Sequence, residues 1–435
     1  MKNIKKSYFI IFGLIVLAVV CFSTSYAIFS NTKEEHGKLN IVAGNLNYKI
    51  ESSELENDSI TIPANTSKEI RIKLTSLNEV SSKYELYYIL DKTNDKLSVG
   101  YSKDTKDSVL GTVEGSSSKM ISIVVRNDSD TSSKVTFKVL GGLLNNNLAL
   151  KDGNSLNKEV EPYRMLSKAI LEDNKLITAN PTLTTSSNNS SDASGLYKST
   201  ATNTGEPTYY FRGNVENNYV SFAGQTWRIV RINEDGTIRI IMQDGINNNT
   251  TYKFNSDYSS YTHMYYTNSQ AKTQLESWYQ TNIGSKTNLA GKVASGAYYC
   301  EQAKVKYADS YTSGSATMTT YNKYTPDFKC SSDGNNKGVV NASVGLLTYD
   351  EVVYAGGYYA KKNNNYYLYN QAIYWWTMSS AGFTGLNSRV WYVDTTGDID
   401  YNNATNNNRL RPVIILTADT PTTGSGTSSD PFVIS

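Results

Sequence analysis

Three tryptophans near the C-terminal end, Trp375, Trp376 and Trp391, are the side chains best suited to bind a ligand by stacking. An aromatic ring that faces a groove contacts sugars or peptides over a large area and can supply much of the binding energy. Core packing is the alternative for each ring. For two adjacent tryptophans on one strand, we expect one ring to point inward and the other outward.

Polar and charged side chains crowd the segment around Trp391, from Gly382 to Asn408. Loops carried by a rigid scaffold are where binding residues concentrate. We therefore predict hydrogen bonding to a ligand here, with an ordinary solvated loop in an asparagine-rich chain as the alternative. The candidate residues are Asn387, Asp394, Asp398, Asp400, Tyr401, Asn403 and Asn407.

Carboxylates of this segment are ligands of the type that Ca²⁺ binds, namely Asp394, Asp398 and Asp400. Their spacing does not follow a regular calcium loop, so calcium lacks the support of a motif. Closeness on a turn does not establish an acid/base pair either. We expect no cofactor, no assigned metal and no catalytic residue.

The N-terminus has the pattern of an export signal. Lysines precede an uncharged stretch from Tyr8 to Ile28, and small residues stand at Ser25 and Ala27. This predicts a signal peptide over residues 1–27, cleaved between Ala27 and Ile28. An uncleaved membrane anchor over residues 8–28 is the alternative, because about 20 apolar residues cross a bilayer. Both place the rest of the chain outside the cytoplasm.

Cysteine and histidine are scarce, which limits nucleophilic and metal chemistry. After cleavage only Cys300 and Cys330 remain, and an oxidising compartment predicts a disulfide between them. A zinc site is poorly supported, since only His36 and His263 could add ligands and neither belongs to an H-E-x-x-H pattern. A cysteine–histidine nucleophile that uses His263 has equally little support.

Composition argues against a nucleic-acid partner and suits a protein with a recognition surface. The 435 residues include 42 basic and 40 acidic side chains, so the net charge of +2 implies no nucleic-acid partner. The 34 tyrosines suit an exposed recognition surface. An AT-rich genome, whose codons favour Asn and Tyr, would explain the same composition.

These candidates must be positioned by at least two folded parts. Alternating runs such as Glu69–Leu74 predict an antiparallel β-sandwich over residues 28–150. Residues 151–194 follow as a short helix, with Leu166, Ala169 and Ile170 on one face, and a flexible Ser/Thr/Asn-rich linker.

The strand and helix patterns of residues 195–435 predict an α+β domain, resembling a C-type lectin as described below, that contains all five tryptophans. Two strands joined by Asn233–Gly236 predict a hairpin. Ala271, Leu275 and Trp278 share one helix face, and Thr348–Glu351 reads as a capping box.

The junction after the apolar stretch resembles the TasA/camelysin family. The matching positions are Ala27, Phe29-Ser30-Asn31-Thr32 and Ala43-Gly44-x-Leu46-Asn47. The resemblance covers about 25 residues of the mature chain. It implies a secreted protein of a Gram-positive bacterium, processed by a dedicated signal peptidase, and a jelly-roll-like first domain.

The second domain resembles bacterial C-type-lectin-like domains, a group that includes the sulfatase-modifying-factor type. Its landmarks are Gly224-x-x-Trp227-Arg228, Tyr374–Ser379, Arg389-Val390-Trp391 and Leu410-Arg411-Pro412-Val413-Ile414. Such folds hold tryptophans and arginines in a scaffold while variable loops bind. The cysteines lie outside these landmarks, which puts the enzymatic chemistry of that group in doubt.

We expect a non-enzymatic, secreted or cell-surface protein, adhesin-like in character, whose lectin-like domain binds an extracellular glycan or protein. One alternative is a biofilm-matrix fibre subunit that assembles with copies of itself through edge strands of the N-terminal domain. Another is a degenerate sulfatase-modifying-type enzyme or a camelysin-like protease. The membrane is a partner during export or as the site of anchoring.

Overall fold

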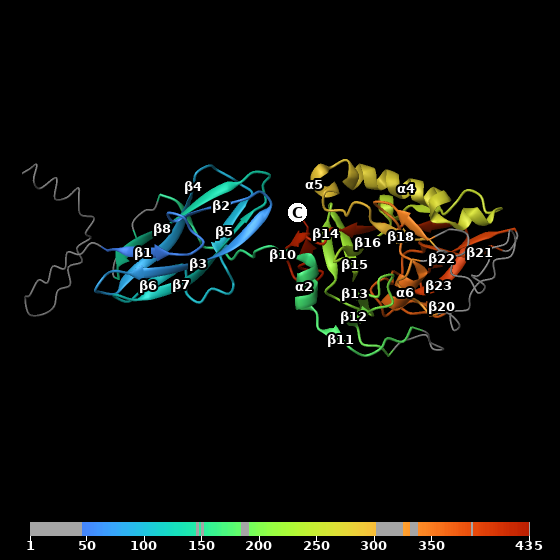
Figure 1. Cartoon of the computed structure of the whole chain (residues 1–435), viewed down its shortest axis with the longest axis horizontal. Coiled ribbons are helices and arrows are strands. Elements are labelled where there is room, and N and C mark those ends of the chain that lie inside the picture. Colours follow the sequence, from blue (N-terminus) through green and yellow to red (C-terminus); the bar gives the residue numbers. More distant parts are fainter. Residues whose placement is uncertain are drawn as a thin grey trace, which may run out of the picture. The chain divides into compact units, whose positions relative to one another are not determined.

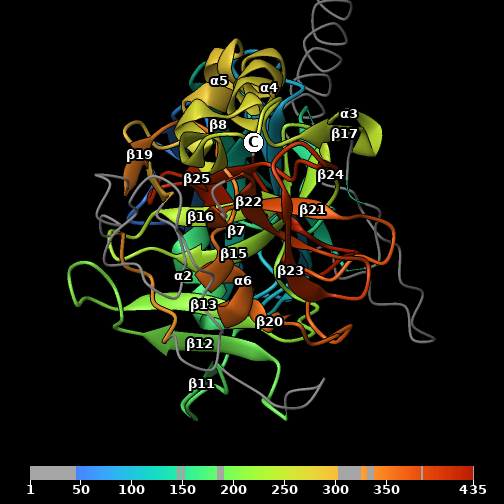
Figure 2. The ribbon, with the colours of Figure 1, turned by 90° about the vertical axis from the view of Figure 1, so that its right-hand side faces the viewer.

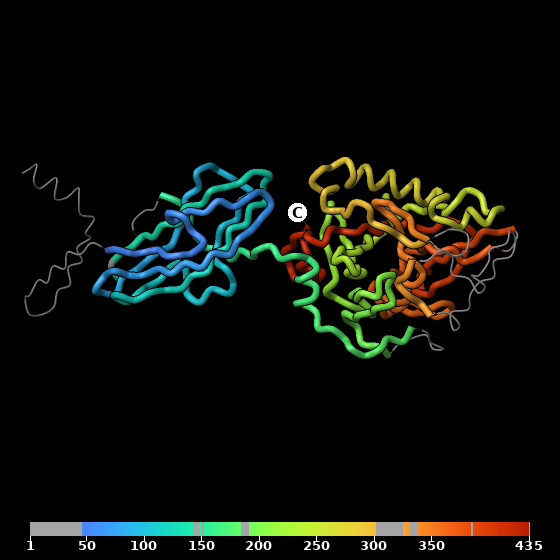
Figure 3. The backbone as a smooth tube through the Cα atoms, in the orientation of Figure 1, coloured from blue at the N-terminus to red at the C-terminus, as the bar shows by residue number. Residues whose placement is uncertain are grey.

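The computed structural model describes residues 46–144, 148, 152–183, 191–301, 325–330, 338–383 and 386–434. The chain divides into two compact units, one ending at Tyr163 and the other beginning at Arg164. Strands predominate over helices and form several sheets (Figure 1), as the sequence predicted for a β-rich chain. The path of the backbone through the strands can be followed in Figure 3.

The first unit is built from two antiparallel sheets. One has the order β1 (Tyr48–Glu51), β3 (Thr66–Ser76), β7 (Ser118–Asn127) and β5 (Leu97–Tyr101). The other has the order β2 (Ser59–Ile62), β8 (Ser133–Leu143), β4 (Ser82–Leu90) and β6 (Leu110–Val113), with β9 (Asn154–Ser155) also paired to β4.

Both sheets of the first unit contribute to a single apolar core. On β3 the residues Ile70, Ile72 and Leu74 are buried and the residues between them are exposed, which confirms the predicted alternation. They join Leu86 of β4 and Phe137 of β8, from the other sheet, in one cluster. Burying each such side chain contributes about 1.5–3 kcal/mol, so this shared core holds the two sheets together.

The predicted short helix is present and belongs to the second unit. Helix α2 (Leu166–Asp173) buries Leu166, Ala169 and Ile170, as its periodicity predicted. All three lie in the core of the second unit. The neighbouring strands β10 (Arg164–Met165) and β11 (Leu176–Ile177) pair with β26 (Pro421–Thr422) and β12 (Gly195–Ser199). Residues 164–177 are therefore part of a folded unit rather than a spacer. Residues 184–190 of the predicted linker lie outside the described residues.

Two larger sheets organise the second unit. The first has the order β11, β12, β13 (Thr208–Arg212), β15 (Gln225–Ile232), β14 (Tyr219–Phe222) and β27 (Phe432–Val433), and β16 (Ile238–Met242) joins β15 to β25 (Val413–Leu416). The second has the order β17 (Thr251–Lys253), β24 (Asn407–Arg409), β21 (Trp375–Phe383), β22 (Ser388–Val393), β23 (Asp398–Asn403) and β20 (Tyr358–Tyr359). A short pair joins β18 (Tyr298–Cys300) and β19 (Val339–Asn341).

Short helices connect and cover these sheets (Figure 2). They are α4 (Gln270–Tyr279), α5 (Thr287–Ala290) and α6 (Tyr349–Ala355), with the 3₁₀-helices η1 (Tyr261–Met264) and η2 (Tyr266–Asn268) and the π-helical turn η3 (Gln280–Gly284). The segment α3 (Ile246–Asn249) is a short turn with left-handed backbone angles. Helix α4 buries Ala271, Leu275 and Trp278, and α6 begins with the predicted capping box of Thr348 and Glu351. The predicted hairpin is β15–β16.

None of the described helices is long and apolar enough to cross a membrane. The predicted signal or anchor at residues 8–28, its cleavage site between Ala27 and Ile28, and His36 all lie outside the described residues.

The predicted disulfide between Cys300 and Cys330 is present, with 5.1 Å between the two Cα atoms. It closes a loop with a sequence separation of 30 residues. Replacing both cysteines by serine should lower the free energy of unfolding of the second unit by about 3–4 kcal/mol, because the unfolded chain regains the entropy of the open loop.

Urea denaturation followed by tryptophan emission tests this prediction, because all five tryptophans lie in the second unit. Dithiothreitol should destabilise the native chain and leave the double serine variant unaffected. Equal stability of the two proteins under oxidising conditions would contradict the prediction.

Candidate functional site

The three candidate tryptophans are core residues. Trp375, Trp376 and Trp391 are at most 1% exposed, and every residue of β21 is buried. The expectation that one ring of the Trp375–Trp376 pair faces outward is therefore wrong, because both faces of this central strand are covered. The Trp376 ring packs against Phe254 and its Nε1–H donates to the Tyr252 carbonyl at 3.0 Å.

Trp391 lies among tyrosines on the opposite side of its strand from Tyr392. Its ring centroid is 4.7 Å from that of Tyr349, 5.2 Å from Tyr359 and 5.8 Å from Tyr401. Tyr401 is held in turn beneath the Arg389 guanidinium, 5.1 Å from its ring centroid. Tyr401 thus has a packing role as a neighbour of Trp391.

The amide candidates are dispersed along the edges of strands. Asn387 precedes β22, Asn403 ends β23, and Asn407 pairs with Lys253 in the ladder between β17 and β24. Asp394 shapes the turn between β22 and β23, since its Oδ1 accepts from the N–H groups of Thr396 at 2.7 Å and Asp398 at 3.0 Å.

One group of the candidates does come together, around the half-buried side of β22 and β23. The register places Tyr392 opposite Asp400, and the ring of Tyr374 lies 6.2 Å from that of Tyr392. Asp394 and Asp400 lie close enough to repel the carboxylate of Asp398, and all three carboxylates repel the ionised form of Tyr392. We call this set, Tyr374, Tyr392, Asp394, Asp398 and Asp400, the acidic–tyrosine face.

Tyr374 and Tyr392 were missed as candidates. The signal that would have found Tyr392 is the alternation of a strand, because a buried Trp391 requires its neighbour to point to the other face. Tyr374 is 42% exposed immediately before the wholly buried strand β21.

The electrostatics of this face are dominated by uncompensated negative charge. Burial, together with repulsion from Asp394 and Asp400, raises the pKa of Asp398 from 3.8 to about 7, even though the Lys361 N–H donates to its carboxylate at 3.0 Å. Burial and the same carboxylates raise the pKa of Tyr392 to about 12. In the described part of the chain, no Lys or Arg side chain forms an ion pair with these three aspartates.

Asp398 should make the stability of the second unit depend on pH. A carboxyl whose pKa is raised on folding stabilises the fold while it is protonated, and this contribution is lost as the pH rises through about 7. We expect Asp398→Asn to remove this loss, so that the variant gains stability relative to the native chain between pH 5 and pH 8. Urea unfolding at several pH values checks the prediction, and an equal pH dependence in both proteins would contradict it.

The three aspartates of the face are not grouped as ligands around a common point. Throughout the described ranges, no group of three or more His, Cys, Asp and Glu side chains is arranged to hold a metal ion. Asp394 already uses Oδ1 to accept backbone N–H groups. What the face offers is carboxylate acceptors beside partly exposed phenol rings, a combination that suits hydroxyl or cationic groups of a ligand.

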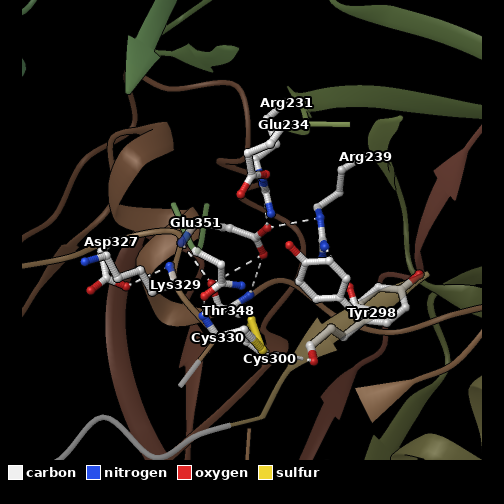
Figure 4. Close-up of a disulfide and its surroundings, with 12 residues drawn as sticks. Arg231, Glu234, Arg239, Tyr298, Cys300, Asp327, Lys329, Cys330, Thr348 and Glu351 are labelled. Carbon is white, nitrogen blue, oxygen red and sulfur yellow. Dashed lines mark hydrogen bonds and ion pairs between the residues drawn. A yellow bond between two sulfur atoms is a disulfide. The ribbon is translucent and has the colours of Figure 1, made fainter. Parts of the chain in front are cut away.

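A second concentration of charge lies next to the disulfide and is buried (Figure 4). Glu351 points toward two guanidinium groups, with its Oε1 3.3 Å from Arg231 Nε and 3.2 Å from Arg239 Nε. Glu234 adds a further ion pair to Arg231 at 3.3 Å. The adjoining cavity has a volume of about 10 Å³, which is room for about one water molecule. This cluster is therefore a structural element of the core.

Two of the sequence landmarks of the second domain meet in the core, through Arg411 and Trp375. Arg411 is fully buried, and its guanidinium donates to the carbonyls of Met242 and Leu368, each at 3.0 Å. The same guanidinium group lies over the Trp375 ring, 4.9 Å from its centroid.

The residues considered for nucleophilic chemistry are engaged elsewhere. His263 pairs with Asp257, with 3.4 Å between Nδ1 and Oδ2, and both Cys300 and Cys330 are oxidised.

Comparison with known proteins gives no relative. No family model matches the chain, and no curated protein and no solved structure matches it either.

Proposed function

We propose that this chain is a non-enzymatic, secreted or cell-surface protein whose second unit binds an extracellular ligand, a glycan or a protein segment. The acidic–tyrosine face carries the proposal. It combines the exposed ring of Tyr374 with the carboxylate of Asp400 beside Tyr392, and described cations do not neutralise its charge. Binding would consist of ring contact and hydrogen bonds, without covalent chemistry.

The same proposal includes a β-sandwich as the first unit, a lectin-like fold for the second unit and a TasA/camelysin-like N-terminal junction. Two sheets that share one core, as in the first unit, are consistent with a β-sandwich of jelly-roll type. The packing of Arg411 on Trp375 joins two of the landmarks that resemble C-type-lectin-like domains. The resemblance of the N-terminal junction to the TasA/camelysin family supports export from a Gram-positive cell.

Array binding with single-residue variants tests the function. The full chain is applied to glycan and extracellular-protein arrays, together with Tyr392→Ala and Asp400→Asn. Both variants should lose the signal while their tryptophan emission stays native. Glu206→Gln, which neutralises an exposed acid outside the face, should bind as the native chain does. Absence of any array ligand, or full binding by both variants, would refute the proposal.

The fibre alternative finds less support in the first unit. Its sheets end in β1, β5, β2 and β6, which are only four or five residues long. Short edge strands are one of the ways in which proteins limit edge-to-edge pairing. The sulfatase-modifying alternative, which needs a cysteine-centred site, lacks a free thiolate at Cys300 and Cys330, because the disulfide occupies both sulfur atoms.

A further inference from the structure

A polar pocket in the second unit lies outside the acidic–tyrosine face. It has a volume of about 510 Å³, within the range of about 300–1,000 Å³ typical of small-molecule sites. Its polar lining comes from the first residue of β15 (Gln225), the segment after β16 (Asp244), α3 (Asn248) and η3 (Asn282), and α4 contributes Trp278. We call it the amide pocket. Figure 2 labels α3 and α4, which border it.

Four polar groups of the amide pocket are left for a ligand. The side chains of Gln225, Asp244 and Asn248 are exposed and have no hydrogen-bond partner among the described residues. Asn282 uses its amide N–H to donate to the Trp278 carbonyl at 2.8 Å and keeps its Oδ1 as an acceptor. Donors and acceptors therefore converge on one cavity, where each amide can give and accept a hydrogen bond.

The backbone that presents Asn248 adopts an unusual conformation. Asn247, Asn248 and Asn249 have φ angles of 50°, 57° and 62°, three consecutive residues in the left-handed region. This region costs roughly 1–2 kcal/mol per residue for most side chains and least for Gly, Asn and Asp. A turn of this kind persists only when its surroundings hold it.

Neighbouring groups fix the turn on both sides. Asn249 Oδ1 accepts from the Gly245 N–H at 2.6 Å, and Arg409 Nε–H donates to the Asn249 carbonyl at 3.0 Å. Asn247 donates to the Tyr252 hydroxyl at 2.8 Å. The three asparagines thus divide their roles, since Asn247 and Asn249 hold the turn and Asn248 presents a free amide to the pocket.

We propose that the amide pocket binds a neutral sugar residue of an oligosaccharide. Neutral amides dominate its lining, and its one charged residue, Asp244, is within electrostatic range of the buried Arg411. Sugar hydroxyls both donate and accept, which matches amides and a carboxylate. Trp278, which is 7% exposed, also lines the pocket and adds a small apolar contact. This is a second site, distinct from the one in the proposed function.

Titration of the full chain with neutral tetrasaccharides tests the inference. The probes are the N-acetylglucosamine tetrasaccharide and the glucose tetrasaccharide, followed by saturation-transfer NMR and isothermal calorimetry. The variants are Asp244→Ala and Asn248→Gly, since glycine removes the amide and retains the left-handed backbone. Each should weaken binding by about tenfold, the effect of one lost hydrogen bond to a ligand.

Two controls separate this site from the acidic–tyrosine face. Asn364→Ala removes an exposed amide outside the pocket and should bind as the native chain does. Tyr392→Ala should also keep tetrasaccharide binding. No binding of either tetrasaccharide, or unchanged binding by Asp244→Ala and Asn248→Gly, overturns the inference without affecting the proposed function. Loss of tetrasaccharide binding in Tyr392→Ala alone would assign the sugar to the acidic–tyrosine face and equally overturn the inference.

Discussion

Glu351→Gln is expected to lower the free energy of unfolding of the second unit by about 3–5 kcal/mol, which is the usual cost of removing one partner from a buried ion pair. Glu351 is 4% exposed between Arg231 and Arg239, which are 3% and 2% exposed. Without its carboxylate, Arg231 would keep Glu234, but Arg239 would have no ion-pair partner among the described residues. A buried guanidinium without a counter-charge is strongly unfavourable.

The substitution isolates the charge because glutamine preserves the rest of the contact. Glu351 Oε2 accepts from the Thr348 N–H at 2.9 Å, and the Glu351 N–H donates to the Thr348 hydroxyl at 3.1 Å. A glutamine carbonyl can accept from the same N–H, so the capping box of α6 is retained. The loss in stability therefore reports the ionic cluster rather than the helix cap.

Urea unfolding followed by tryptophan emission measures the effect, and Glu276→Gln is the matched control. Glu276 pairs with Lys272 at 2.6 Å on the surface of α4, where an i, i+4 pair contributes about 0.3–0.5 kcal/mol. Similar losses in the two variants would contradict a special role for Glu351.

Acid should reproduce part of the Glu351→Gln effect in the native chain. Burial alone would raise the pKa of Glu351, but the attraction of Arg239 and Arg231 outweighs it and the pKa is lowered from 4.5. A lowered carboxyl pKa stabilises the fold above the pKa of the unfolded chain. This contribution is lost as the pH falls below about 4.5, and the variant should not show that loss.

Much of the local structure could be predicted because its causes are local. The Thr348–Glu351 capping box, the helix face of Ala271, Leu275 and Trp278, and the β15–β16 hairpin each depend on residues a few positions apart. The disulfide was predictable because Cys300 and Cys330 are the only cysteines outside the apolar N-terminal stretch, which contains Cys21.

The candidate site was harder to predict because burial depends on contacts distant in sequence. Arg231 and Glu351 meet across 120 positions, and Trp376 is covered by Phe254 and Tyr252 from a different part of the chain. A local pattern shows that two adjacent side chains point to opposite faces of a strand. It does not show that both faces are covered, as they are on β21.

The neighbours Trp391 and Tyr392 allow core packing and ligand binding to be separated on a single strand. Trp391→Ala should lower the free energy of unfolding of the second unit by about 3–5 kcal/mol, since it leaves a cavity among Tyr349, Tyr359 and Tyr401. Tyr392→Ala should cost less than half as much, because its ring is partly exposed.

Ligand binding should show the reverse order. Under conditions where Trp391→Ala remains folded, it should bind the array ligand as the native chain does, because its ring has no exposed surface to offer. Tyr392→Ala should remain folded and lose binding. Urea unfolding and array binding are measured on the same preparations of the two variants. Together they show which of the two side chains packs the core and which contacts the ligand. Loss of binding by folded Trp391→Ala, with full binding by Tyr392→Ala, would return the ligand contact to the tryptophan side of β22. That outcome would require the buried ring to become exposed when the ligand binds.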